Sequence, residues 1–89
     1  MKSTTTEKFR LLFASASTER QLRIKGAYRL WKENPAQPSL RFKKVHPRLP
    51  IYSVREDLNW RAVGILEADT VVWFWVGPHP QYEALLKSL

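Results

Sequence analysis

His79 is the residue of this sequence best suited to move a proton. It follows Gly77 and Pro78 at the end of the apolar run Thr70–Val76, and Pro80 comes directly after it. Prolines on both sides restrict the backbone, so they limit how far the imidazole can move. Histidine titrates near neutrality and serves as a general acid or base. A second interpretation stays open, in which His79 only forms part of a turn.

Arg61 is the most unusual of the cations, because it stands in an apolar segment. Trp60 precedes it, and residues 62–65 are apolar or glycine. An arginine in such a place reaches a sheet edge, pairs with an acid or faces a groove that receives an anion. The nearby acids are Glu56, Asp57 and Glu67. Other cations of this half either bind an anion or form a solvated patch: Lys43, Lys44, Arg48 and Arg55.

The aromatic residues near these cations have two interpretations each. Tyr82 lies three residues after His79, and it either stacks on a nucleobase or covers the core. Trp73 and Trp75 alternate along the last apolar run, which predicts that both point to one face of a strand. Such a stripe most often belongs to the core, and the alternative is a groove for a partner's apolar helix.

The composition excludes several kinds of site. The chain has no cysteine, and His46 and His79 stand far apart, so no metal-ligand spacing is present. With three glycines it has no glycine-rich phosphate loop and no nucleophile elbow. We therefore expect neither a metal nor a cofactor. The absence of cysteine also fits a cytoplasmic protein, and no apolar run approaches the ~20 residues of a membrane span.

The net charge of +7 is unevenly distributed over the 89 residues. Residues 1–34 carry +5 and residues 35–56 carry +4, whereas residues 57–89 carry −2. A basic first half favours a polyanion or an acidic protein as partner, and the alternative is a surface that only keeps the protein in solution.

Two helices are predicted before any strand. Residues 3–17 place apolar side chains at i, i+3, i+4 and i+7 after a capping signature at Thr4. Residues 17–35 repeat this pattern from Thr18, and they end where a proline follows Asn34. The connection between the two segments is short, which predicts an antiparallel helical hairpin.

An antiparallel meander follows, because short turns join runs of strand-forming residues. The predicted strands are Leu40–Val45, Ile51–Glu56, Trp60–Leu66 and Thr70–Val76, and a short helix begins near Pro80. The last strand is apolar on both faces and is expected inside the sheet. The sequence thus predicts a single α+β domain over residues 1–89, with a helical hairpin packed on a curled antiparallel sheet of three to four strands and a short C-terminal helix.

Three features occur in an order that resembles a known family. A helix ends at Asn-Pro before a short basic strand, Trp60-Arg61 follows a turn, and Gly77-x-His79 closes an apolar last strand. They lie in "AYRLWKENPAQPSLRFKKV" and "YSVREDLNWRAVGILEADTVVWFWVGPHPQYEALL". These segments resemble the RelE/ParE superfamily of toxins from bacterial type II toxin–antitoxin systems, and the resemblance spans residues 20–86.

The resemblance implies a fold, an activity and a partner. Members fold as two helices against an antiparallel sheet. Many cut messenger RNA in the ribosomal A site without metal, others poison DNA gyrase, and a typically acidic antitoxin wraps and silences the toxin. This sequence starts directly with helix-forming residues, so we expect the first strand to be missing and a sheet edge to be open. Ser53 also stands where RNA-cutting relatives often have lysine, and the tail lacks their arginine cluster.

The resemblance also assigns roles to residues. Arg55 matches a basic position on the middle strand, Arg61 matches the arginine after an aromatic residue, and His79 matches a position where many relatives have arginine. Metal-free RNA cleavage uses the 2′-OH as nucleophile, and it needs a base, cations for the charge at phosphorus and an acid for the leaving 5′-oxygen. We expect Arg55 and Arg61 to hold the phosphate and His79 to be the general acid or base.

The predicted protein is a translation-inhibiting messenger RNA endonuclease that forms a hetero-oligomer with its antitoxin. Lys43, Lys44 and Arg48 are expected to bind RNA or the ribosome, and Trp60 or Tyr82 to stack on a base. The alternatives are a gyrase poison that uses the helix cations Arg20, Arg23 and Lys25, or a homologue that only binds its antitoxin. The sequence leaves open whether Arg55 and Arg61 share a face with His79, because a one-residue shift in register reverses a side chain.

Overall fold

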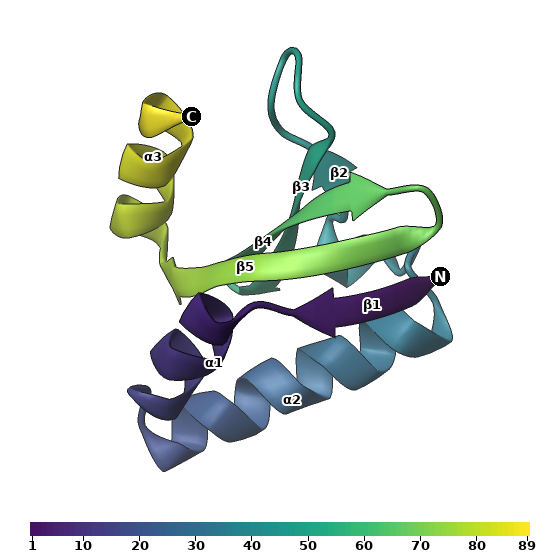
Figure 1. The fold of residues 1–89 in the computed structure, drawn as a ribbon. Coiled ribbons are helices and arrows are strands. Elements are labelled where there is room, and N and C mark those ends of the chain that lie inside the picture. The colour runs from purple at the N-terminus through teal and green to yellow at the C-terminus, as the bar shows by residue number, and fades with distance from the viewer.

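In a computed structural model that describes residues 1–89, a five-stranded sheet lies between helices on its two faces (Figure 1). The strand order is β1-β5-β4-β3-β2, with β1 parallel to β5 and all other pairs antiparallel. The predicted α+β class is confirmed. The elements are β1 (Lys2–Thr5), α1 (Glu7–Ala14), α2 (Thr18–Glu33), a 3₁₀ turn (Pro38–Leu40), β2 (Lys43–Lys44), β3 (Ile51–Asp57), β4 (Trp60–Glu67), β5 (Thr70–Pro78) and α3 (His79–Ser88).

The expectation that the first strand is missing is wrong. Residues Lys2–Thr5 form β1, which runs parallel to β5 and makes the sheet mixed and five-stranded. The polar Ser/Thr run reads as a helix cap, but β-branched threonines also favour strands, and an edge strand needs few apolar residues. The cap lies two residues later than predicted, because the Thr6 hydroxyl accepts the Phe9 N–H at 3.1 Å.

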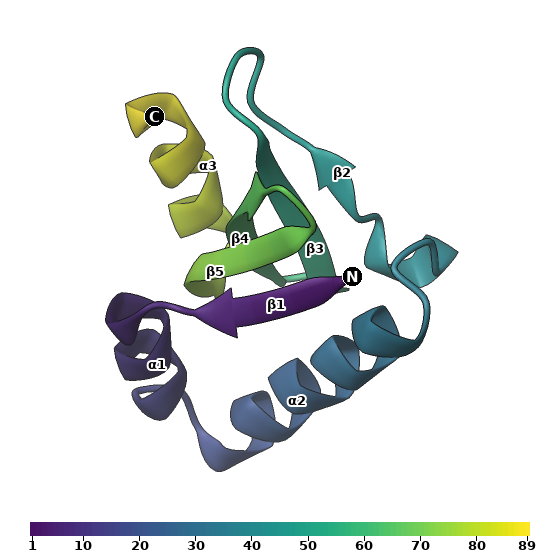
Figure 2. The ribbon, with the colours of Figure 1, turned by 45° about the vertical axis from the view of Figure 1, so that its right-hand side comes forward.

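The helices α1 and α2 follow each other closely, but they do not pack along one another as a hairpin. They diverge from their connection and enclose a space against the sheet (Figure 2). Ser17, rather than Thr18, caps α2 by accepting the Arg20 N–H at 3.1 Å. Near the other end of α2, the Trp31 ring meets the Trp73 ring edge-on at 5.3 Å, which fixes that end on the sheet.

The strand predicted over Leu40–Val45 is shorter than expected. Leu40 is buried in the core at the end of the 3₁₀ turn, and Arg41 follows with φ 46° and ψ 45°. This left-handed backbone, uncommon for a residue with a Cβ, turns the chain so that only Lys43–Lys44 pairs with β3.

β5 lies inside the sheet between β1 and β4, as predicted, but its two tryptophans do not share a face. Val63 of β4 pairs with Trp75, whereas the next residue, Gly64, pairs with Trp73, so β5 has a bulge. Trp73 therefore packs in the core under α2, and Trp75 packs in the core under α3. Both are buried, so the prediction that they belong to the core is confirmed, and the one-face prediction is wrong because the extra residue reverses the alternation.

Two glycines leave room for the rings of these tryptophans to lie against the backbone of the sheet. A Cβ on Gly64 would stand 2.7 Å from Val71 Cγ1 and 2.9 Å from Trp73 Cε3. A Cβ on Gly77 would stand 2.7 Å from the Trp75 ring. The Trp75 ring therefore leaves no room for a side chain at position 77.

No helix in the fold has both the length and the apolar character of a membrane span.

Candidate anion-binding site

The strand register answers the question of which side chains share a face. Arg55 of β3 stands directly opposite Arg61 of β4, so both point to the same side of the sheet. Gly77 pairs with Arg61 on the next strand, and two residues later His79 donates its backbone N–H to the Asn59 carbonyl at 2.7 Å. The end of β5 thereby brings His79 beside the two arginines.

These residues line a pocket of about 200 Å³ between β2, β3, β4 and α3, which we call the basic pocket. Four Lys or Arg side chains and one histidine face a single carboxylate there. Such an excess of positive charge in a concave site suits an anion. The lining residues are Arg41, Lys43, Ser53, Arg55, Arg61, His79, Tyr82, Glu83 and Leu86.

His79 occupies the first turn of α3 and is partly open to solvent. Its Nε2 lies 3.2 Å from Glu83 Oε1, one helical turn further on, and 42% of its side chain is exposed. Its Nδ1 is buried and has no hydrogen-bond partner. The imidazole is therefore held at the pocket by the contact of one nitrogen with Glu83, and its other nitrogen has no partner within the protein.

Arg61 makes no ion pair in the structure. Its Nη1 donates to the carbonyl oxygens of Asp57 at 2.8 Å and Trp60 at 3.0 Å. Its Cζ lies 5.9 Å from the centre of the Tyr82 ring, within cation–π range. Backbone carbonyls and an aromatic face thus hold the guanidinium without cancelling its charge, and the remaining N–H groups are free for a ligand.

Two of the three acids near Arg61 in the sequence, Glu56 and Asp57, pair with Arg20 instead. Arg20 Nη1 lies 2.5 Å from Glu56 Oε2 and 2.5 Å from Asp57 Oδ2, and the Glu56 side chain is only 2% exposed. Burial raises the pKa of Glu56, and this effect outweighs the hydrogen bond from Arg20, which acts to lower it. Burial also acts to raise the pKa of Asp57, but hydrogen bonds from Arg20 and from the N–H groups of Asn59 and Trp60 outweigh it and lower that pKa.

Tyr82 covers the core rather than standing free. It is buried in the cluster of Ile51, Val63 and Trp75, and its hydroxyl donates to Ser53 Oγ at 3.2 Å. Its ring contacts Arg61 and His79 from below the pocket. In this position the ring supports the pocket and is not open for stacking on a base.

The remaining predicted site residues are divided. Lys43 lines the basic pocket, but Lys44 donates to the His46 carbonyl, and neither it nor Arg48 lines the pocket. Trp60 lies under the Arg20 guanidinium, 4.6 Å from its Cζ, and is also outside the pocket. No group of three His, Cys, Asp or Glu side chains is arranged to hold a metal ion.

Sequence reasoning missed three polar lining residues and the apolar Leu86. Arg41 enters the pocket after the left-handed turn, which no local signal in the sequence predicts. Ser53 lies two residues before Arg55, so strand alternation places both side chains on the same face and predicts that Ser53 also lines the pocket. Glu83 could have been found from the sequence, because it stands four residues after His79 in a predicted helix.

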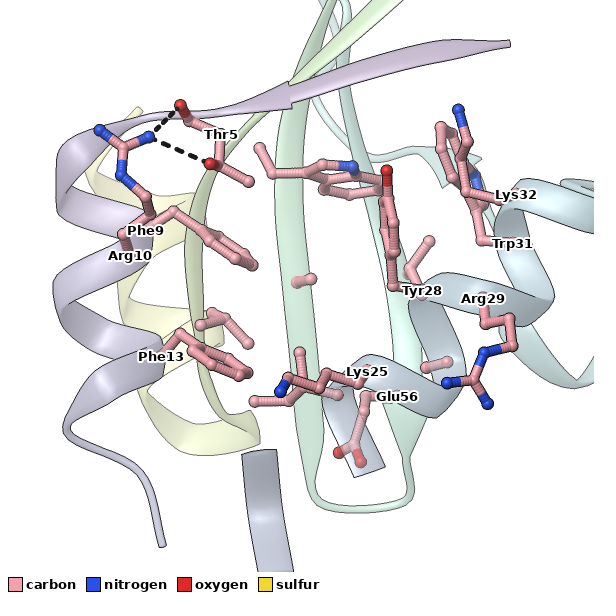
Figure 3. Close-up of a pocket in the computed structure, with 16 residues that line it drawn as sticks. Thr5, Phe9, Arg10, Phe13, Lys25, Tyr28, Arg29, Trp31, Lys32 and Glu56 are labelled. Atoms are coloured by element: carbon pink, nitrogen blue, oxygen red, sulfur yellow. Dashed lines mark hydrogen bonds between the residues drawn. The ribbon is translucent and has the colours of Figure 1, made fainter. Parts of the chain in front are cut away.

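A larger apolar pocket of about 490 Å³ lies on the other face of the sheet, between α1, α2 and the strands (Figure 3). Val54 and Glu56 line it, whereas Ser53 and Arg55 line the basic pocket, because successive residues of β3 point to opposite faces. The aromatic side chains that line it are Phe9, Phe13, Tyr28, Trp31 and Trp73, and the cations are Arg10, Lys25, Arg29 and Lys32. We call it the apolar pocket.

Solved structures of several toxins share this architecture. A chain of the RelB-RelE antitoxin–toxin complex from Methanococcus jannaschii superposes with a TM-score of 0.71 at 16% identity, over 91% of this chain and 95% of that one. YafQ from E. coli strain BL21(DE3) gives a TM-score of 0.72 at 10% identity, over 91% and 96%. The YoeB/ParE toxin from Agrobacterium tumefaciens gives 0.69 at 14% identity, over 89% and 99%.

The likeness lies in the fold and not in the sequence. No protein-family model matches the chain, and no curated protein matches it in sequence. The matched structures are covered almost end to end, so the likeness involves the whole architecture. The resemblance inferred from the sequence is thereby confirmed at the level of structure: this chain has the fold of the RelE/ParE toxins.

Proposed function

We propose that this protein is the toxin of a type II toxin–antitoxin system and that it cleaves messenger RNA in the cytoplasm. The observation that carries the proposal is the convergence of Arg55, Arg61 and His79 on one basic pocket. The assignment as a toxin is supported by the fold, which this chain shares with structures of RelB-RelE toxin–antitoxin complexes. The excess of cations over acids in the pocket supports a phosphodiester as the ligand.

Each group has a role in cleavage by the 2′-OH. The hydroxyl oxygen attacks the adjacent phosphorus, the bond from phosphorus to the 5′-oxygen breaks, and a 2′,3′-cyclic phosphate and a 5′-hydroxyl result. Arg55 and Arg61 stabilise the negative charge that grows on the phosphoryl oxygens. His79 takes the proton from the 2′-OH or gives one to the leaving 5′-oxygen, which commonly contributes ~10²–10⁴ in rate.

An acidic antitoxin is the proposed protein partner, in a toxin–antitoxin hetero-oligomer. Antitoxin–toxin complexes occur among the structures that share the fold. The apolar pocket has aromatic walls and a rim of four cations, which suits an apolar segment flanked by acids. Messenger RNA on the ribosome is the proposed target, and a partner in the apolar pocket lies on the opposite face from it.

The alternative of a gyrase poison has less support. It depends on the basic side of α2, where Arg20 pairs with Glu56 and Asp57, and Arg23 pairs with Glu19 and Asp57. Side chains engaged in this way stabilise the fold and are less available to a partner. No specific observation favours gyrase over RNA.

Induction of His79→Gln and Arg61→Ala variants tests the proposal. We expect the wild-type protein to stop translation before DNA replication, and both variants to lose toxicity while they stay folded. Lys87→Ala, at the far end of α3, is the matched control and should stay toxic. RNA fragments from a translating extract should end in 2′,3′-cyclic phosphates. Full growth arrest by both variants, at equal protein level, would show that the assignment is wrong.

A further inference from the structure

A buried hydrogen bond joins α3 to the floor of the basic pocket. The Tyr82 hydroxyl donates to Ser53 Oγ at 3.2 Å, and the two residues are 6% and 3% exposed. Ser53 is the one polar residue among the buried residues of the chain. Buried hydroxyls need a partner, so each of these side chains satisfies the other. A lysine at position 53 could not accept this hydrogen bond, because an ammonium group only donates.

The same tyrosine ring lies against two of the three groups to which chemistry is assigned. The ring centres of Tyr82 and His79 are 5.7 Å apart with an interplanar angle of 34°, and Arg61 Cζ lies 5.9 Å from the Tyr82 ring. His79 belongs to α3, whereas Arg61 belongs to β4 and Ser53 to β3. Tyr82 is therefore the side chain through which the position of the helix is set against the two strands that carry the cations.

We propose that Ser53 and Tyr82 act as a positioning pair for the basic pocket. Their hydrogen bond fixes α3 against β3, so that the imidazole of His79 and the guanidinium of Arg61 face one phosphate. Both residues line the pocket, but neither is assigned a chemical step. The catalytic consequence rests on the proposed RNA cleavage, but the geometric consequence does not, and the two are measured separately.

Substitutions that remove one hydroxyl each test the pair. Tyr82→Phe and Ser53→Ala delete the donor and the acceptor, and a double variant deletes both. Tyr52→Phe is the matched control, because Tyr52 lies next to Ser53 on β3 and its hydroxyl makes no hydrogen bond. Ser53→Thr keeps a hydroxyl and should behave like the wild type. Thermal unfolding shows which variants stay folded, and only those are compared.

The first measurement does not depend on activity. The chain has two histidines, so a His46→Gln variant assigns the imidazole NMR signals, which are followed during titration with inorganic phosphate. We expect Tyr82→Phe and Ser53→Ala each to move the His79 signal and to change its response to phosphate, with no further effect in the double variant. The Tyr52→Phe control should leave both unchanged. An unchanged His79 signal in folded single variants, or additive effects in the double variant, would overturn the positioning pair.

The second measurement is cleavage of an RNA oligonucleotide. Small displacements of a catalytic group cost up to ~10²-fold in rate, so we expect kcat to fall about tenfold in each single variant, with KM within about twofold of the wild type. The pH profile of kcat should also move, which a loss of stability alone would not cause. A rise in KM with kcat unchanged would contradict the proposal. If the wild type cleaves no RNA, the proposed function fails, and the phosphate titration still decides on the pair.

Discussion

The substitution Arg20→Met tests how α2 is held on the sheet. Arg20 is the cation that pairs with both Glu56 and Asp57, and methionine keeps a flexible apolar stem in its place without the charged guanidinium. The Glu56 side chain is 2% exposed, so the variant leaves a buried carboxylate without a cation. Arg20 also covers the Trp60 ring at 4.6 Å, and that contact is lost too.

The magnitude follows from burial. Breaking one side of a buried ion pair costs about 3–5 kcal/mol. Arg20 and Asp57 are 19% and 24% exposed, so water replaces part of the interaction, and we expect roughly 2–4 kcal/mol. For a domain of this size that loss lowers Tm by roughly 10–25 °C. Since whole domains have only about 5–15 kcal/mol of stability, the variant should be close to unfolding at physiological temperature.

Urea denaturation followed by tryptophan fluorescence measures this loss. Arg23→Met is the control, because Arg23 is 54% exposed and lies 3.4 Å from Asp57, so it should cost about 1 kcal/mol or less. Adding Glu56→Gln to Arg20→Met should restore part of the stability, since the buried charge is then absent. The loss in Arg20→Met should also shrink in acid, where Glu56 takes a proton. An Arg20→Met variant as stable as Arg23→Met would refute the reasoning.

Three further outcomes are expected. Combined Lys25→Glu and Arg29→Glu substitutions at the rim of the apolar pocket should weaken binding of an acidic antitoxin about tenfold or more and leave toxicity intact. The control Lys8→Glu, outside the pocket, should change neither property, and a loss of toxicity alone in the double variant would contradict the separation of the two faces. Gly64→Ala places a Cβ against Val71 and should destabilise the fold by about 2 kcal/mol in urea denaturation, and a neutral effect would show that the bulge can relax. Asp57 has a lowered pKa, so its ionised form stabilises the fold above its ordinary pKa and the contribution disappears as pH falls through the folded value. Asp57→Asn should therefore cost roughly 2 kcal/mol at neutral pH and progressively less in acid, and a pH-independent loss would contradict this sign.

Local patterns predicted much of the architecture. The periodicity around Ile24 and Trp31 predicts α2, and both side chains are buried as a helical stripe requires. Alternation and short turns predict β3, β4 and β5 to within one or two residues. The placement of Gly77 and Pro78 before His79 predicts an imidazole at the end of the last strand, and the structure places it there, in the first turn of α3.

Other features depend on contacts between distant segments. A polar strand of four residues shows no hydrophobic pattern. β1 forms because Lys2–Thr5 pairs with β5, which is distant in the sequence. The bulge opposite Val63 and Gly64 is a property of a strand pair, and it alone decides that Trp73 and Trp75 enter different cores. No single segment contains the information for either feature.

The sequence by itself determined which residues were candidates to bind an anion or move a proton, because charge, titration range and the types of neighbouring residues are local properties. Only the tertiary structure decided which of them lie together. The pairing of Arg55 with Arg61 depends on the register of β3 and β4, and a shift of one residue would have turned one of them to the opposite face. In the same way, the buried hydrogen bond from Tyr82 to Ser53 joins residues 29 positions apart, and it forms only after the sheet and α3 have packed.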